Sequence, residues 1–179
     1  MTTPIPPSWL PEIVLFTGDW DVFVRSLYAI FEKDFKCSPP RFRSFPVWHN
    51  QKVEPGDKYG FEEGFWHLVS KDEWVYDRVT RRKEKQRLPE FDRAGRLPWA
   101  KPMIHHDGDP SILVWDYEEE SSRGKVVRSY LWIKEYDYVV ILERQTANRG
   151  DIFKLITSFH VCYEAKRKDL ESRYGRRIK

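Results

Sequence analysis

The sequence is poor in cysteine and has no long apolar run. Cys37 and Cys162 are its only cysteines, and they form no CxxC pair. Two isolated cysteines cannot build a disulfide framework, so the sequence predicts a protein of a reducing compartment, the cytoplasm. No stretch approaches 18 apolar residues, and residues 1–7 lack a charged segment followed by an apolar one. We therefore expect no membrane span, no membrane partner and no signal peptide.

The signatures of several large enzyme classes are also missing. The chain has no P-loop, no dinucleotide fingerprint, no GxSxG, no HExxH and no paired CxxC. Residues 105–110 carry metal-ligating residue types, but neighbours in a Gly/Pro turn lack the rigid support of a catalytic metal. We expect a polar turn there, and neither a metal nor a cofactor. A metal-dependent hydrolase that uses His105, His106 and Asp109 is the alternative.

Aromatic residues and clustered positive charge are abundant. Phe, Trp and Tyr make up 16% of the chain, which can serve both a core and platforms for stacking bases. Residues 78–101 contain nine Lys or Arg against three acids, and residues 164–179 contain seven against three. One such run is usually a solvated face, but two separate runs favour a polyanion partner.

Hydrophobic patterning predicts one α+β domain over residues 1–179. Its expected parts are an N-terminal extension and helix (1–40), a His-containing and basic segment (41–110), an antiparallel sheet (111–162) and a basic helix with a tail (163–179). The first helix begins after the N-cap Asp19, with Trp20, Val24, Leu27 and Phe31 at helical spacing. Within residues 41–110 we expect short strands at 45–48 and 64–70, and helix or loop over 78–101.

The sheet is predicted from four segments with period-two patterning. Short connectors join the last three segments, which forces antiparallel neighbours because a parallel crossover needs a dozen or more residues. The predicted strands are Ser111–Tyr117, Val126–Lys134, Tyr138–Arg144 and Ile152–Val161. Helices first and a strand meander last indicate an α+β fold with a four-stranded antiparallel sheet.

Two residues could carry acid–base chemistry or bind phosphate. His67, in a predicted strand, is either a general acid or base or a half-buried core histidine. Arg128 alternates with Tyr130 and Trp132 on one strand face, which suits a phosphate site beside stacked bases. The alternative is an exposed arginine whose stem covers those rings.

The last predicted strand adds two hydroxyl groups and a histidine. Strict alternation places Thr157 on one face with Leu155 and Phe159, and Ser158 on the other face with His160. Only one of the two hydroxyls can therefore share a site with His67. A threonine in a strand is also ordinary, because threonine favours β-structure.

Five runs give the chain a family resemblance over roughly residues 60–165. They are Phe65-Trp66-His67-Leu68, residues 93–99 (RAGRLPW), residues 128–132 (RSYLW), residues 138–143 (YVVILE) and residues 155–159 (LITSF). In this order they resemble the phage-associated branch of the barnase–EndoU–colicin–RelE nuclease superfamily. Relatives tend to have Thr-Ala-Tyr where this chain has Thr157-Ser158-Phe159, so a tyrosine hydroxyl is missing.

The resemblance implies N-terminal helices followed by a four-stranded antiparallel sheet. It also implies metal-independent RNA cleavage to a 2′,3′-cyclic phosphate, in a toxin or in phage–host conflict, with an antitoxin or immunity protein as a further partner. The implied catalytic residues are His67, Arg128 and Thr157. Further RNA-binding candidates are Arg96, Arg144, Ser158, His160, Lys166 and Arg167. The alternative function is a non-catalytic module that binds RNA or a protein.

Overall fold

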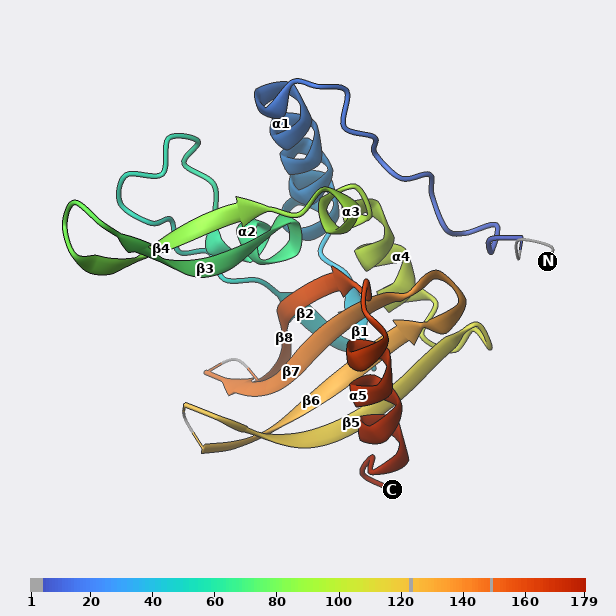
Figure 1. The fold of residues 1–179 in the computed structure, drawn as a ribbon. Helices are drawn as coiled ribbons and strands as arrows, with labels where there is room; N and C mark the ends of the chain where they lie inside the picture. Colours follow the sequence, from blue (N-terminus) through green and yellow to red (C-terminus); the bar gives the residue numbers. More distant parts are fainter. Residues whose placement is uncertain (1–4, 123, 149) are drawn as a thin grey trace.

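The computed structural model describes residues 5–122, 124–148 and 150–179. In Figure 1 the N-terminal helices and a long two-stranded hairpin lie at one end of the molecule, and a twisted sheet lies at the other. None of the described helices has the length and apolarity needed to cross a membrane. The fold class is α+β, as the sequence predicts.

The main sheet contains the four predicted strands and two more. β5 (Ile112–Ser121), β6 (Gly124–Ile133), β7 (Tyr138–Ala147) and β8 (Gly150–His160) form an antiparallel meander. β2 (Phe45–Trp48) pairs in parallel with β8, and β1 (Arg41–Phe42) pairs with β2. The described order is β1-β2-β8-β7-β6-β5, so the prediction of four strands was wrong. The short strand predicted at 45–48 is confirmed as β2, but its pairing with β8 was not predicted. The two-residue β1 is too short to show a period.

The first helix matches its prediction. α1 (Trp20–Phe31) begins where the Asp19 carboxylate accepts a hydrogen bond from the Val22 amide. Leu27 and Phe31 are fully buried, as helical spacing predicts. A π-helical segment, η1 (Glu32–Cys37), prolongs α1 until Pro39 and Pro40 end it.

Each face of the sheet covers its own apolar cluster. Leu131, Ile133 and Leu142 pack with the N-terminal helices in the larger cluster. The smaller cluster lies under α5 (Glu164–Gly175), the predicted basic C-terminal helix, and contains Trp115, Tyr130, Trp132 and Leu170. Figure 1 shows α5 lying across the sheet. Leu170 and Tyr174 dock α5 on this cluster.

The His67 segment is a helix, so the strand predicted at 64–70 was wrong. α2 (Glu63–Val69) buries every residue except His67. An almost wholly apolar run does not distinguish a strand from a buried helix by period. Gly64 decides the packing, because a Cβ there would lie 2.8 Å from the His49 Cβ and 2.9 Å from the Asn50 carbonyl oxygen. The glycine lets α2 approach the chain that follows β2.

The first half of the basic stretch forms a hairpin, where helix or loop was expected. β3 (Ser70–Asp77) pairs antiparallel with β4 (Arg82–Pro89) from Ser70–Pro89 to Asp77–Arg82. β4 reads RKEKQRLP and has no apolar alternation, because most of the hairpin is exposed. Three short helices follow: α3 (Phe91–Ala94), η2 (Leu97–Trp99) and α4 (Ala100–His105). The polar turn predicted at 105–110 begins as α4 ends.

Candidate active site

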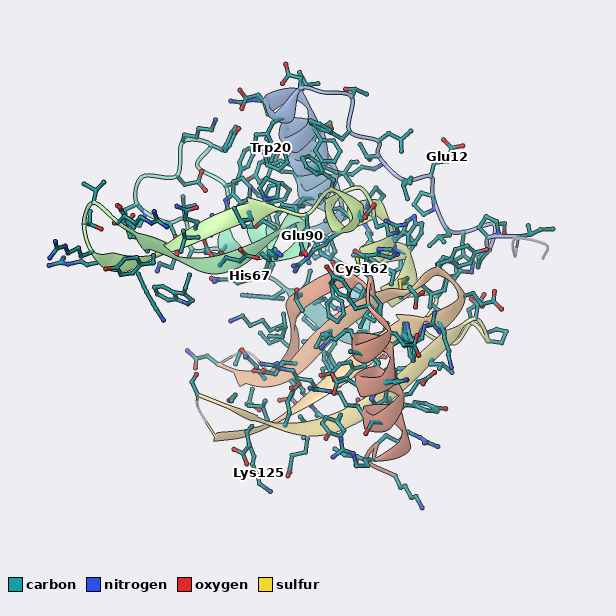
Figure 2. All side chains as sticks on the ribbon, in the orientation of Figure 1. Glu12, Trp20, His67, Glu90, Lys125 and Cys162 are labelled. Atoms are coloured by element: carbon teal, nitrogen blue, oxygen red, sulfur yellow. The ribbon has the colours of Figure 1, made fainter. Side chains whose placement is uncertain are left out.

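A cavity of about 240 Å³ opens between α2, the hairpin, α3 and β8. His67 is the exposed residue of α2 and lines this cavity with Thr157 of β8. In Figure 2 His67 is labelled beside the hairpin strands. The structure therefore brings two of the three predicted catalytic residues together. The full lining is Glu63, Trp66, His67, Ser70, Lys71, Asp72, Arg87, Arg93 and Thr157.

A β-bulge in β8 directly precedes Thr157. The β7–β8 register pairs Leu142 with Leu155 but Ile141 with Thr157, so Ile156 is the extra residue. The bulge changes the alternation. Leu155 and Ser158 point to the face of the larger cluster, whereas Thr157 points to the opposite face, together with Ile141. Thr157 was predicted to share a face with Leu155, and that prediction was wrong because a bulge leaves no period in the sequence.

Thr157 and Arg93 hold the His67 backbone in place. The Thr157 hydroxyl donates to the His67 carbonyl oxygen at 2.9 Å. The Arg93 guanidinium donates to that same carbonyl and to the Thr157 hydroxyl, the second bond at 2.5 Å. Arg93 is buried, and Glu90 accepts a further hydrogen bond from it at 3.1 Å. Since the Thr157 proton is already used, this geometry makes Thr157 a positioning residue for His67.

Acidic and basic groups alternate around the His67 ring. The Glu63 carboxylate is buried and lies 3.6 Å from His67 Nε2, one helical turn away. Arg87 donates to Glu63 at 2.5 Å and so compensates the buried charge. Burial lowers the pKa of His67 below its usual 6.5; Glu63 and Asp72 oppose the shift, and Arg93 and Arg87 support it. The imidazole is therefore mainly neutral near pH 7 and able to accept a proton.

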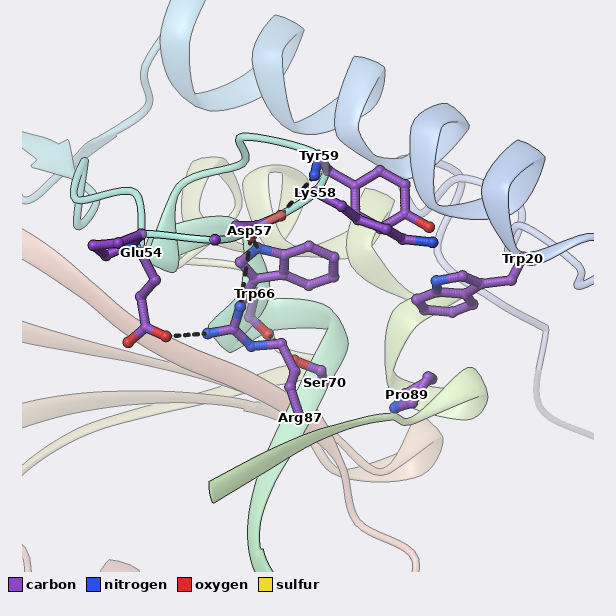
Figure 3. A pocket seen from close by; sticks show the side chains of 11 residues that line it. Trp20, Glu54, Asp57, Lys58, Tyr59, Trp66, Ser70, Arg87 and Pro89 are labelled. Atoms are coloured by element: carbon purple, nitrogen blue, oxygen red, sulfur yellow. Dashed lines mark hydrogen bonds and ion pairs between the residues drawn. The ribbon is translucent and has the colours of Figure 1, made fainter. Parts of the chain in front are cut away.

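A second cavity of about 350 Å³ adjoins the first and shares Trp66, Ser70 and Arg87 with it. Figure 3 shows Trp66, Tyr59 and Trp20 around this cavity, with Arg87 along its lower side. Trp66 Nε1 donates to Asp57 at 2.5 Å, and the Arg87 guanidinium lies 5.0 Å from the centre of the Trp66 ring. Aromatic walls beside a polar rim suit a planar ring system bound next to the His67 cavity.

The hairpin gives the cavity a basic border. Residues 71–89 carry seven Lys or Arg against four acids, and both Lys71 and Arg87 reach the cavity. Trp74 and Tyr76 are 68% and 56% exposed. Figure 1 shows β3 and β4 projecting away from the body of the molecule. Exposed rings interleaved with cations are typical of surfaces that bind single-stranded nucleic acid.

Arg128 lies elsewhere. It is on β6, opposite Glu143 of β7, and therefore two strands or about 10 Å across the sheet from β8. Its guanidinium donates to Glu143 at 3.2 Å and to Glu119 at 3.3 Å, next to Tyr130 in the α5 cluster. The predicted face, shared with Tyr130 and Trp132, is confirmed. The expected convergence with His67 and Thr157 is not observed, because the ion pairs of Arg128 join β5, β6 and β7.

We expect Arg128→Met to cost stability and to leave any activity of the His67 cavity intact. Removing the guanidinium takes one hydrogen-bond donor from each of the carboxylates of Glu119 and Glu143. This loss should lower the free energy of unfolding by about 1–3 kcal/mol. Urea unfolding measures that cost. RNA cleavage per folded molecule, compared with the wild-type protein, would fall by orders of magnitude only if Arg128 contacted the reacting phosphate.

The six further RNA-binding candidates are scattered. Arg96 covers Trp99, and Arg144 pairs with Asp151. Ser158 is fully buried and accepts a hydrogen bond from Tyr138 at 2.8 Å. The two α5 candidates are paired: Lys166 lies 3.2 Å from Asp169, and Arg167 lies 2.5 Å from Asp137. His160 lies at the end of β8, beside Cys162.

The sequence interpretation missed Arg93, Arg87, Glu63 and Lys71. Arg93 could have been predicted, because it is the first residue of the second resembling run and stands three residues before Arg96. Glu63 stands one helical turn before His67, a spacing that matters only once the segment is known to be helical. The pairing of β3 with β4 brings Arg87 beside α2, but these strands show no apolar alternation in the sequence that would predict the pairing.

Comparisons with known proteins add no relative. No family model matches the chain, and neither a curated protein nor a solved structure matches it. The function must therefore be argued from the geometry of the site.

Proposed function

We propose that this protein is an endoribonuclease that uses the 2′-hydroxyl of its substrate as the nucleophile. One observation carries the proposal: a neutral, accessible histidine lies in a cavity with Arg93 and Lys71, beside an aromatic cavity and a basic hairpin. RNA requires that combination, namely a proton acceptor, cations for a phosphate and rings for a base.

The reaction would run with His67 as the general base. Its neutral imidazole takes the 2′-hydroxyl proton, and the 2′-oxygen bonds to phosphorus. The bond from phosphorus to the 5′-oxygen then breaks, and that oxygen takes a proton from solvent at the open side of the cavity. The products are a 2′,3′-cyclic phosphate and a 5′-hydroxyl. Glu63, 3.6 Å from Nε2, stabilises the imidazolium that forms.

The other residues of the cavity bind and position the substrate in this proposal. Arg93 and Lys71 offset the charge that builds on the phosphorane oxygens. Thr157 and Arg93 fix the His67 backbone, and Arg87 pairs with the buried carboxylate of Glu63. The aromatic cavity beside Arg87 takes a base next to the scissile phosphate.

The test is to incubate the purified protein with total RNA in EDTA and to map the product ends. We expect cleavage to persist in the chelator and to give 2′,3′-cyclic phosphate and 5′-hydroxyl ends, because every proposed group is a side chain. Products with 3′-hydroxyl ends, or cleavage that stops in EDTA, would contradict the mechanism.

A non-catalytic RNA-binding module is the second candidate. The exposed rings and cations of the hairpin favour it, because they need no reaction to bind RNA. Binding without cleavage of any RNA would support this candidate over the first.

A further inference from the structure

Three metal-ligating side chains meet outside the His67 cavity, where β8 ends against α3. Asp92, His160 and Cys162 each offer one ligand atom, and these atoms lie within 4.8 Å of one another. His160 Nδ1 is 3.3 Å from Cys162 Sγ. Figure 2 labels Cys162 just past the end of β8. Among the described residues, His105, His106 and Asp109 form no such group.

The fold fixes two of these side chains as a pair. Val161, between His160 and Cys162, is buried in the α5 cluster, and its amide donates to the Asp137 carbonyl at 2.6 Å. His160 and Cys162 flank Val161, and the contact between His160 Nδ1 and Cys162 Sγ brings their side chains to the same side. Asp92 is brought near because the next residue, Arg93, is bound to Thr157 of β8.

We propose that Asp92, His160 and Cys162 bind one Zn²⁺ ion, with water as the fourth ligand. Tetrahedral zinc with ordinary bond lengths places its nitrogen, oxygen and sulfur ligands about 3.3–3.6 Å apart. The His160–Cys162 spacing already fits. The Asp92 side chain is 78% exposed and can rotate to close the third side.

The donor set and the local charge favour zinc. A thiolate and an imidazole select a borderline-soft ion over Mg²⁺ or Ca²⁺, which prefer oxygen ligands only. The thiolate and the carboxylate together balance the charge of Zn²⁺. Arg96 lies 3.8 Å from Asp92 and is the nearby cation that the ion must displace from that carboxylate.

The proposed role is structural. Zinc would link α3 to the end of β8, the two elements that supply Arg93 and Thr157 to the His67 cavity. The site lies outside the cavity and takes no part in the proton transfers, and Arg93 and Thr157 keep their own hydrogen bonds to each other and to His67 without it. It is therefore independent of the proposed ribonuclease chemistry, which is expected to persist in EDTA.

The test uses Co²⁺, which takes zinc-like sites and absorbs light when a thiolate binds it. The full-length protein is stripped with EDTA under reducing conditions, freed of chelator and titrated with Co²⁺. We expect one equivalent to bind with a thiolate-to-cobalt charge-transfer band, and Zn²⁺ to displace it. Cys162→Ser should abolish the band, and His160→Ala or Asp92→Asn should weaken binding at least tenfold. Cys37→Ser is the matched control, because it removes the other exposed thiol and should change nothing.

The same preparations give a second measurement, since an ion that links two elements of the folded state raises the midpoint of thermal unfolding. We expect Zn²⁺ to raise the midpoint of the wild-type and Cys37→Ser proteins and not that of Cys162→Ser. The proposal is overturned if no charge-transfer band forms, if Cys162→Ser retains it, or if Cys37→Ser loses it. None of these measurements involves RNA, so they stand apart from the test of the nuclease.

Discussion

Replacing His67 with alanine should reduce RNA cleavage by about 10²–10⁴-fold, the usual contribution of a positioned general base. The fold should survive, because the His67 side chain is 46% exposed and only its backbone carbonyl binds Thr157 and Arg93. Alanine retains that carbonyl. Initial cleavage rates on a short RNA, together with unfolding midpoints, separate loss of chemistry from loss of structure.

His105→Ala is the control, because His105 is also exposed but lines a different cavity. The pH profile adds a signature that a structural role would not give. Since burial lowers the pKa of His67, cleavage should rise with pH through a value below 6.5 and then level off. Asp72→Asn should move that rise to lower pH, because the Asp72 carboxylate raises the His67 pKa. Full cleavage by His67→Ala would remove His67 from the mechanism.

Neutralising the hairpin should remove most of the salt dependence of RNA binding. The variant replaces four exposed cations with glutamine: Arg78, Arg81, Arg82 and Lys83. Each lost contact with a single-stranded phosphate flattens the slope of log K against log salt by about 0.7, so four contacts flatten it by roughly 3. Binding of a fluorescent single-stranded RNA at several salt concentrations measures the slope. Cleavage of a dinucleotide should hardly change, because so short a substrate cannot reach the hairpin tip.

The C-terminal region offers a matched variant with the same charge change. Lys168, Arg176, Arg177 and Lys179 are exposed, and replacing them removes four positive charges far along the chain from the hairpin. A general effect of net charge would flatten both slopes equally. If the C-terminal variant loses the salt dependence of RNA binding and the hairpin variant keeps it, then α5 and the tail bind the RNA. The basic composition of residues 164–179 is compatible with that outcome.

Patterns of period two and 3.6 predicted the body of this fold. The meander from β5 to β8 and the capped helix α1 follow from residues whose burial repeats regularly. The face of β6 that carries Tyr130 and Trp132 was predicted from alternation, and the structure places Leu131 and Ile133 on the other face. Regular alternation is reliable there because one strand buries both faces.

The site was harder to predict because its geometry depends on irregular features. A glycine contact sets α2 against residues 49–50, a bulge at Ile156 turns Thr157, and a polar hairpin brings Arg87 to Glu63. None of these leaves a period in the sequence. Residue types and the resemblance together indicated His67, Thr157 and Arg128. The first two line the cavity, whereas Arg128 lies in an ion-pair network on the sheet.

The hydrogen bonds that position His67 also determine when the cavity can form during synthesis. His67 and Arg93 belong to the first 93 residues of the chain, but the hydroxyl that ties them together belongs to residue 157. A ribosome must therefore complete most of the protein before β8 can pair with β7 and deliver that hydroxyl. Until then a nascent chain carries the histidine without the hydrogen bonds that position it in the finished cavity.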